Sequence, residues 1–376
     1  MPPLRFIHTS DLQLGMPFHW VEGDQAAKMR EARLESLTRI GDAAREHDAS
    51  VVMVAGDFFD ANTVEQRLIV QTCDRLRDLG RPVYILPGNH DHGGADSVYR
   101  TDRFTSRKPP NVEVLLSQAP VAIQDGAAVI LPAPLLRRHS ADDPSRHWSA
   151  EAGRDLAPDA VRVGLAHGGV QSFSSESAQN VVDVSRAKDA NLDYVALGDW
   201  HGLKQVDERS WYAGAPEPTS FKDNSPGHVL LVELPGPGEP AQVAPLAVAR
   251  TRWIRHEASL SSREQVMMLA RFFEGLTNPS DTLVRLELRG ALSLDDFGLL
   301  DRVLDDARAR LLHLRVRGEG VLPAPTREEL LGLASDGYVR AAVERLQSRV
   351  EATETTTAAA AARALQLLYR LRQGAA

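Results

Sequence analysis

The chain has 376 residues, of which 43% are hydrophobic, and its formal net charge is −8. This length is sufficient for two or three domains with cores of their own, and the negative charge excludes a general polyanion-binding protein. The single cysteine, Cys73, excludes an internal disulfide framework. No apolar stretch approaches the ~20 residues that span a bilayer, so we expect a soluble cytoplasmic protein without a membrane partner.

The first 90 residues alternate between strands and helices. Short apolar runs predict buried strands, and helical periodicity predicts the helices between them. The expected segments are strand 4–8, helix 26–47, strand 51–55, helix 64–79 and strand 83–86. This alternation predicts a parallel sheet of the α/β class, covered on both faces.

From about residue 112 the pattern changes to short strands separated by turns. Strands are expected at 112–116, 121–124, 128–131, 161–166, 194–197, 211–213 and 228–234. The run 235–240, rich in proline and glycine, lies between closely spaced apolar segments, so we predict a hairpin tip there.

Residues from about 250 onward predict a separate small α/β domain and a helical tail. The expected order is strand 253–256, helix 262–274, strand 283–288, helix 295–309 and strand 312–316. In the tail, the first helix places Val339, Val343, Leu346 and Val350 at helical spacing, and a second helix runs from about 358 to 372. We therefore predict domains at 1–249, 250–320 and 321–376.

Five clusters of oxygen and imidazole donors follow the predicted strands of the first domain. In chain order they are Asp11-Leu12-Gln13, Gly56-Asp57, Gly88-Asn89-His90-Asp91-His92, His167-Gly168-Gly169 and Gly198-Asp199-Trp200-His201-Gly202. The carboxyl ends of strands in an open α/β sheet are where ligands bind. Each cluster by itself also occurs in ordinary turns, but five in succession favour a common site.

Such a set suits the hydrolysis of phosphate esters by two metal ions. Ions ~3.5–4 Å apart activate a water and stabilise both the entering and the leaving oxygen. We expect Asp57 to bridge the ions, Asp11 and His201 to complete one, and three further donors to complete the other: Asn89, His167 and Asp199. His90 is expected to be catalytic, protonating the leaving oxygen or stabilising the charged transition state.

The order of these motifs resembles the calcineurin-like metallophosphoesterase superfamily. With the following α/β cap and helical tail, the chain is most similar to the SbcD-type exonuclease subunit of DNA repair nucleases. The resemblance covers roughly residues 4–320 and implies a two-sheet sandwich flanked by helices. It also implies manganese, DNA phosphodiester cleavage and an SbcC-type SMC ATPase partner. Carried over by motif, the resemblance implies His90 as catalytic and, as ligands, Asp11, Asp57, Asn89, His167 and His201.

Two positions depart from the pattern of that family. Gln13 stands where the first motif normally has histidine, and Asp199 replaces the first histidine of the last motif. Fewer imidazoles and an added carboxylate favour manganese, with magnesium as the alternative, over zinc. The two departures also allow a second, less favoured interpretation, in which the site binds a single metal ion or is inactive.

The residues themselves support DNA binding and partner binding less strongly than they support the metal site. Four basic residues follow the Asn-His cluster and are candidates for DNA binding, although a solvated face is as plausible: Arg100, Arg103, Arg107 and Lys108. The apolar stripe of the tail suits docking against a coiled coil or packing on the cap of the same chain. A homodimer through helix 64–79 is a further hypothesis. The competing functions are a small-molecule phosphodiesterase or phosphatase and a catalytically weak scaffold for the ATPase.

Overall fold

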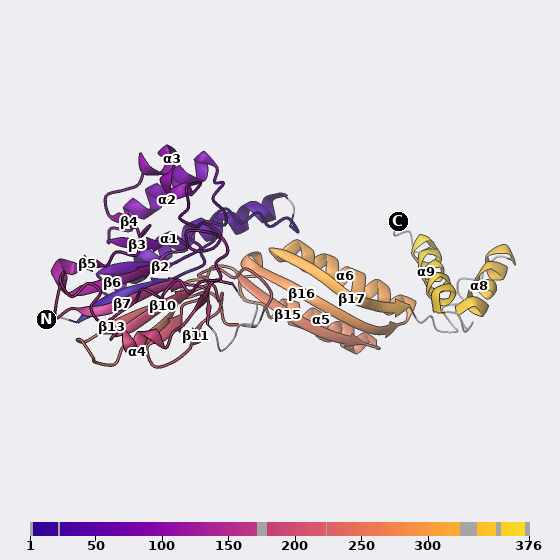
Figure 1. Cartoon of the computed structure of the whole chain (residues 1–376). Coiled ribbons are helices and arrows are strands. Elements are labelled where there is room, and N and C mark those ends of the chain that lie inside the picture. Colours follow the sequence, from indigo (N-terminus) through magenta and orange to yellow (C-terminus); the bar gives the residue numbers. More distant parts are fainter. Residues whose placement is uncertain are drawn as a thin grey trace. The chain divides into compact units, whose positions relative to one another are not determined.

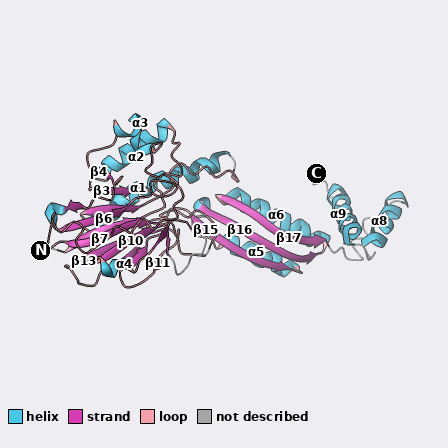
Figure 2. Cartoon of the chain, viewed as in Figure 1, coloured by secondary structure: helices cyan, strands magenta, loops and turns pink. Residues whose placement is uncertain are grey.

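The computed structural model of the protein describes residues 3–21, 23–170, 179–222, 224–323, 337–350 and 355–372. The chain folds as two compact units, Met1–Thr251 and Arg252–Ala376, whose helices and strands are shown in Figure 1 and Figure 2. Within the described residues, no helix is both long and apolar enough to cross a membrane.

Two six-stranded sheets form the frame of the first unit. The first has the order β14-β13-β1-β2-β3-β4. Its strands are β1 (Leu4–Thr9), β2 (Val51–Ala55), β3 (Val83–Leu86), β4 (Val112–Val114), β13 (His228–Leu234) and β14 (Gln242–Ala247). The second has the order β11-β12-β10-β7-β6-β5. Its strands are β5 (Val121–Ile123), β6 (Ala128–Ala133), β7 (Val161–His167), β10 (Tyr194–Gly198), β11 (Lys204–Gln205) and β12 (Ser210–Tyr212).

Apolar side chains on both faces of the strands make this unit layered. In β1, Phe6 points into the core between the two sheets, where it meets residues such as Val163 of β7. The next residue, Ile7, belongs to the core on the other face of the sheet, beneath α1 (Gly23–Glu46) and α2 (Gln66–Asp78). A third core covers the outer face of the second sheet. The predicted α/β fold with two sheets and flanking helices is therefore confirmed.

The strands near the donor clusters run in parallel, as their alternation with helices predicts. β1, β2, β3 and β4 pair in parallel in that order, and β7 pairs in parallel with β6 and β10. The segment between β13 and β14 is the hairpin expected from its proline and glycine content, because these strands pair antiparallel. The short elements were not foreseen: α3 (Asp102–Thr105), α4 (Arg186–Asp189), β8 (Gly169–Val170), β9 (Val181–Val182) and the 3-10 turns η1 (Val98–Arg100) and η2 (Gln124–Gly126).

The second unit is built on a three-stranded parallel sheet of order β15-β16-β17. Its elements are β15 (Arg252–Leu260), α5 (Arg263–Glu274), the 3-10 turn η3 (Pro279–Asp281), β16 (Thr282–Leu292), α6 (Leu294–Arg310) and β17 (His313–Pro323). Ser262 and Ser293 cap the two helices, since their hydroxyls accept hydrogen bonds from Gln265 N and Asp296 N. Side chains of α5 and α6 share one core with alternate residues of the strands, so both helices cover the same face of the sheet.

Two tail helices complete the second unit. They are α8 (Gly337–Val350) and α9 (Thr355–Arg372), which pack against each other. Val343 of α8 and Leu365 of α9 are buried together with Leu294 at the start of α6. The apolar stripe predicted in the tail thus packs on the cap of the same chain, which was one of its two interpretations. β17 continues to Pro323, beyond residue 320, where the cap was expected to end.

Candidate metal centre

The loops that follow β1 and β2 continue the pairing of those strands and so bring their carboxylates together. Asp11 N donates to Gly56 O at 3.1 Å, Gln13 N to Asp57 O at 2.9 Å, and Leu14 N to Phe58 O at 2.9 Å. These main-chain bonds fix the register of the two loops. Asp11 and Asp57 therefore lie at the same edge of the sheet, and both side chains are buried.

Four predicted ligands have a left-handed backbone conformation. The φ angles are 54° for Asp11, 44° for Gln13, 50° for Asp57 and 98° for Asp199. Residues other than glycine adopt positive φ at a cost, and in folded proteins such strain gathers where a site requires it. Four of the twelve described residues other than glycine with positive φ are these donors, and they lie at the ends of three different strands.

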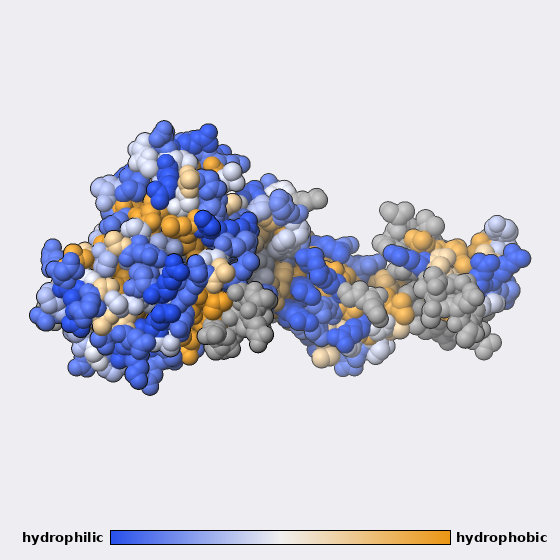
Figure 3. All heavy atoms as spheres, viewed as in Figure 1, coloured by the Kyte–Doolittle hydropathy of each residue, from blue (hydrophilic) through white to orange (hydrophobic). Residues whose placement is uncertain are grey.

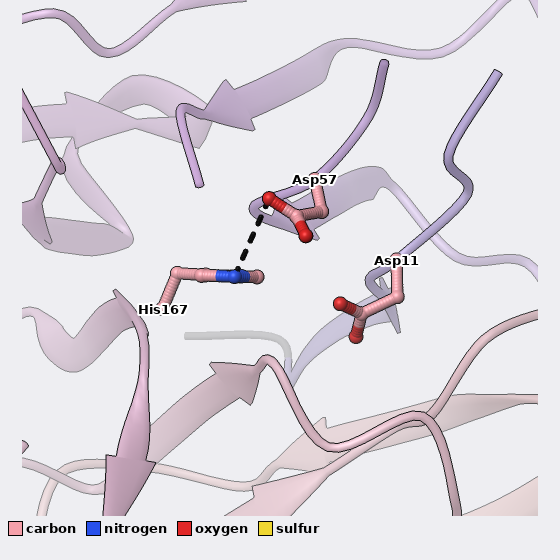
Figure 4. A group of neighbouring side chains, drawn as sticks. All are labelled: Asp11, Asp57 and His167. Carbon is pink, nitrogen blue, oxygen red and sulfur yellow. Dashed lines mark ion pairs between the residues drawn. The ribbon is translucent and has the colours of Figure 1, made fainter. Parts of the chain in front are cut away.

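Asp11, Asp57 and His167 form the centre of the site. One ligand atom from each lies within 4.8 Å of the ligand atoms of the other two, and all three residues are buried. Figure 4 shows the two carboxylates and the imidazole turned toward a common space. The His167 Nε2 atom is 3.4 Å from Asp57 Oδ1.

The His167 ring is oriented by a main-chain carbonyl. Its Nδ1 atom lies 2.8 Å from Ala55 O, and because a carbonyl only accepts, Nδ1 is the protonated donor. Nε2 is left to face the donors, with Asn89 Oδ1 at 2.8 Å and Asp199 Oδ1 at 3.8 Å. Gly56 makes room for the ring, since a Cβ there would lie 2.2 Å from His167 Nδ1.

The electrostatics of the centre favour a cation at Nε2. Burial alone would lower the pKa of His167, but the surrounding carboxylates, led by Asp57, raise it to about 9. Burial also raises the pKa of Asp11, and the imidazoles of His201 and His167 act in the opposite direction. Buried carboxylates and oxygen atoms that converge on one imidazole nitrogen suit a divalent cation, which would take the place of the proton. The donor set therefore fits the metal that such a centre would hold.

His201 and Gln13 form a second group of donors beside Asp11. His201 Nε2 is 3.7 Å from Asp11 Oδ1 and 3.4 Å from Gln13 Nε2. Thr219 fixes the His201 ring through a contact of 2.6 Å between Oγ1 and Nδ1. Gln13 turns its amide nitrogen toward the imidazole, so the amide would have to rotate to offer its oxygen to an ion.

His90 lies next to the centre and approaches it through its main chain. His90 N donates to Asp57 Oδ1 at 2.9 Å, and the ring Nδ1 lies 2.8 Å from Asp60 O. The carbonyl again makes Nδ1 the donor, which leaves Nε2 as the nitrogen that can exchange a proton. The side chain is 29% exposed, so a substrate can reach it.

Asp91 and Tyr99 support the two ligand loops, a role that the sequence analysis missed. The buried Asp91 carboxylate accepts hydrogen bonds from Gly88 N at 2.7 Å, Phe59 N at 3.0 Å and Tyr99 Oη at 2.5 Å. It thus joins the Asp57 loop to the Asn89 loop. Its place within the Gly-Asn-His-Asp run was the only signal in the sequence.

Arg33 is a second supporting residue that the sequence did not reveal. This buried arginine of α1 donates to Leu12 O at 2.7 Å and to Pro218 O at 2.9 Å. It braces the Asp11 loop against the segment that carries Thr219. Burial lowers the pKa of Arg33 to about 10, so it remains a cation at neutral pH.

Three of the four basic residues expected to bind DNA have local contacts. Arg100 Nε donates to Gly93 O at 3.2 Å and Gly94 O at 3.1 Å, and Lys108 Nζ donates to Val112 O at 2.5 Å. Arg107 reaches Ser106 Oγ at 3.3 Å. Arg103 is exposed on the short helix α3. A role in DNA binding stays a prediction for all four residues.

Comparison with known proteins identifies a family for more than half of the chain. Residues 4–203 match the calcineurin-like phosphoesterase family. The chain therefore belongs to this family of metal-dependent phosphoesterases.

Individual relatives align over shorter segments. The uncharacterized metallophosphoesterase YhaO of Bacillus subtilis is 31% identical over 123 residues, which are 31% of this chain and 29% of that protein. The D subunit of the nuclease SbcCD of Escherichia coli (strain K12) is 33% identical over 96 residues, or 23% of this chain and 21% of that protein. Each alignment thus spans less than a third of the relative. The solved structure of TT1561 from Thermus thermophilus covers 65% of this chain and 99% of its own, with a TM-score of 0.42 and 13% identity.

Proposed function

We propose that this protein is a DNA nuclease that hydrolyses phosphodiester bonds at the centre formed by Asp11, Asp57 and His167. The observation that carries the proposal is the convergence of these buried donors, which lie at the carboxyl ends of three different strands. The similarity to a subunit of the nuclease SbcCD supports a nucleic acid as the substrate.

The arrangement of donors suggests a division of labour. Asp57 is central and would be shared between two ions, with Asn89, His167 and Asp199 on one side of it. Asp11 and His201, with Gln13 after an amide rotation, would serve the other side. Two divalent ions held in this way would activate a water and neutralise the phosphoryl oxygens. His90, whose Nδ1 is engaged by Asp60 O, would donate the proton on Nε2 to the leaving oxygen.

Manganese is the ion that this donor set favours. Three carboxylates and two amides outnumber the two imidazoles, and oxygen donors suit manganese and magnesium better than zinc. In a metal-reconstitution assay we expect manganese to give the highest turnover and magnesium to support activity. Highest turnover with zinc would contradict this assignment.

We also propose that the protein is the nuclease subunit of a complex with an SbcC-type SMC ATPase. The name of the Escherichia coli relative supports a subunit role, as does a helical tail joined to the cap. A homodimer through α2 stays a prediction.

One experiment separates the candidate functions. Purified protein with manganese is incubated with labelled single-stranded and double-stranded DNA and, in parallel, with nitrophenyl phosphate esters. Cleavage of DNA supports the nuclease. Turnover of the small esters alone would favour a small-molecule phosphodiesterase or phosphatase. If no substrate is hydrolysed with any divalent ion, the scaffold function is the candidate that remains. The Asn89→Ala and His90→Ala variants control for contaminating nucleases.

A further inference from the structure

The sheet of the second unit has one face that α5 and α6 do not cover. The helices pack on the side chains of Ile254, Val284 and Leu314 and on further residues at alternate positions, such as Leu286 and Leu288. Because side chains alternate along a strand, the intervening residues point to the opposite face. We call this opposite face the arginine face, after the residues that dominate it.

Three arginines lie side by side across the arginine face. The strand registers align Arg255 with Arg285 and Arg285 with Arg315. Neighbouring strands are about 4.8 Å apart, so the three residues form one continuous row. Arg289 and Arg317 extend the positive charge along the same face of β16 and β17. Hydrophilic side chains cover much of the region of β15–β17 in the view of Figure 3.

Among the described side chains of this face, Glu257 and Glu287 hold three of the arginines in place. Glu257 pairs with Arg255 and with Arg289, each at 2.8 Å. Glu287 pairs with Arg285 at 2.7 Å and with Arg255 at 3.2 Å. Three arginines therefore share two carboxylates, and Arg317 on the same face is exposed. Arg255 and Arg289 keep 51% and 67% of their side-chain surface exposed, so their guanidinium groups remain accessible.

The charge of the α/β part of this unit is unevenly distributed. Residues 252–323 contain 11 arginines and 11 acidic residues, so this part of the chain is neutral as a whole. The helices α5 and α6 hold seven of the acidic residues and five of the arginines. A neutral domain with a basic sheet face and an acidic helical side has a directional attraction for a polyanion.

We propose that the arginine face binds the phosphate backbone of duplex DNA. Guanidinium groups match phosphate oxygens in geometry and are less strongly hydrated than ammonium groups, so they suit such contacts. Contacts to phosphate oxygens orient a protein on its nucleic acid without reading sequence. Trp253 lies on the same face, two residues before Arg255, but the row itself consists of arginines, which contact phosphates rather than stack on the bases of a single strand. This inference rests on the proposed function, because it names where that substrate is held.

The test measures DNA binding by three variants of the full-length protein. The first carries Arg255→Gln, Arg285→Gln and Arg315→Gln. The second carries Arg289→Gln and Arg317→Gln at exposed positions, where a folding defect is least expected. The control carries Arg263→Gln, Arg308→Gln and Arg310→Gln on α5 and α6, which removes the same charge as the first variant. Fluorescence anisotropy with labelled duplex and single-stranded DNA in EDTA, at several salt concentrations, reports affinity without cleavage.

We expect the first variant to bind the duplex more weakly, with a salt dependence shallower by about 0.9 for each phosphate that the variant no longer binds. The second variant should show a smaller loss, and the control should bind like the unchanged protein. Wild-type affinity and salt dependence in both arginine-face variants would overturn the inference, and so would a loss confined to single strands. Manganese-dependent cleavage by the unchanged protein is measured in parallel. If the unchanged protein cleaves DNA and the arginine-face variants bind DNA with unaltered affinity, only this inference is refuted. If the unchanged protein does not cleave DNA, the proposed function is refuted.

Discussion

His167 links protonation of the centre to metal binding. Its pKa is raised to about 9, so at pH 7 the metal-free imidazole carries a proton among the carboxylates. A divalent ion that binds Nε2 must displace this proton. We therefore expect the affinity for manganese to rise about tenfold per pH unit between pH 7 and pH 9. Calorimetry in buffers of different ionisation enthalpy should detect release of about one proton at pH 7, and a pH-independent affinity would contradict this picture.

The same shift predicts how the metal-free protein responds to pH. The folded-state pKa of His167 lies above its ordinary value of 6.5, so the charged form stabilises the fold. This contribution is fully present below pH 6.5 and is lost as the pH rises toward 9. Denaturant unfolding of the metal-free protein should show this loss, and a His167→Asn variant should not.

His90 and Asn89 are adjacent residues with different expected roles. Asn89 Oδ1 lies 2.8 Å from His167 Nε2, whereas the His90 ring is held by Asp60 O outside the group of ligands. We expect His90→Gln to lower kcat by about 10²–10⁴, the range for loss of a general acid, with manganese affinity unchanged. Asn89→Ala should weaken manganese binding itself. Titration of both variants followed by electron paramagnetic resonance distinguishes the two roles, and equal loss of affinity would refute the assignment.

The loops after β2 and β3 are held together by one buried carboxylate. Asp91→Ala would leave the N–H groups of Gly88 and Phe59 and the hydroxyl of Tyr99 without their acceptor. Such a loss costs about 3 kcal/mol of the free energy of unfolding, whereas Tyr99→Phe should cost about 1 kcal/mol. Denaturant unfolding measures both values. Asp96→Ala, at a side chain that is 76% exposed, is the matched control and should be nearly neutral.

The two compact units suggest that catalysis and association can be separated. The donors of the centre lie between Asp11 and His201, within the unit Met1–Thr251. The tail helices belong to the other unit, where Val343 and Leu365 pack on Leu294. The opposite side of α8 is exposed, and we predict that the ATPase docks there, so deletion of all residues after Pro325 should abolish association with a co-expressed SMC ATPase and spare nuclease activity. Copurification and a DNA cleavage assay measure the two outcomes, and retained association would show that the ATPase binds elsewhere.

Much of the centre could be predicted because its donors follow strands in a recognisable order. Asp57 and His167 each come directly at the end of an apolar run, and parallel strands bring such ends to one edge. Asp91 and Arg33 could not be predicted in the same way. Their roles depend on hydrogen bonds to main-chain atoms of distant segments, such as Phe59 N and Pro218 O. Main-chain donors and acceptors have the same chemistry at every position, so sequence carries no sign of these partners.

The sequence by itself determined the α/β class, the order of the strands along the chain and the chemical identity of the donors. Hydrophobic periodicity and polar residues at strand ends are local properties, so they can be recognised in the sequence without the structure. Only the tertiary structure decided how far apart the donors lie and that the tail stripe packs on its own cap. It also decided that Arg255, Arg285 and Arg315 form one row. These three arginines are about 30 residues apart in sequence, and strand register, which arises from contacts across the sheet, brings them together.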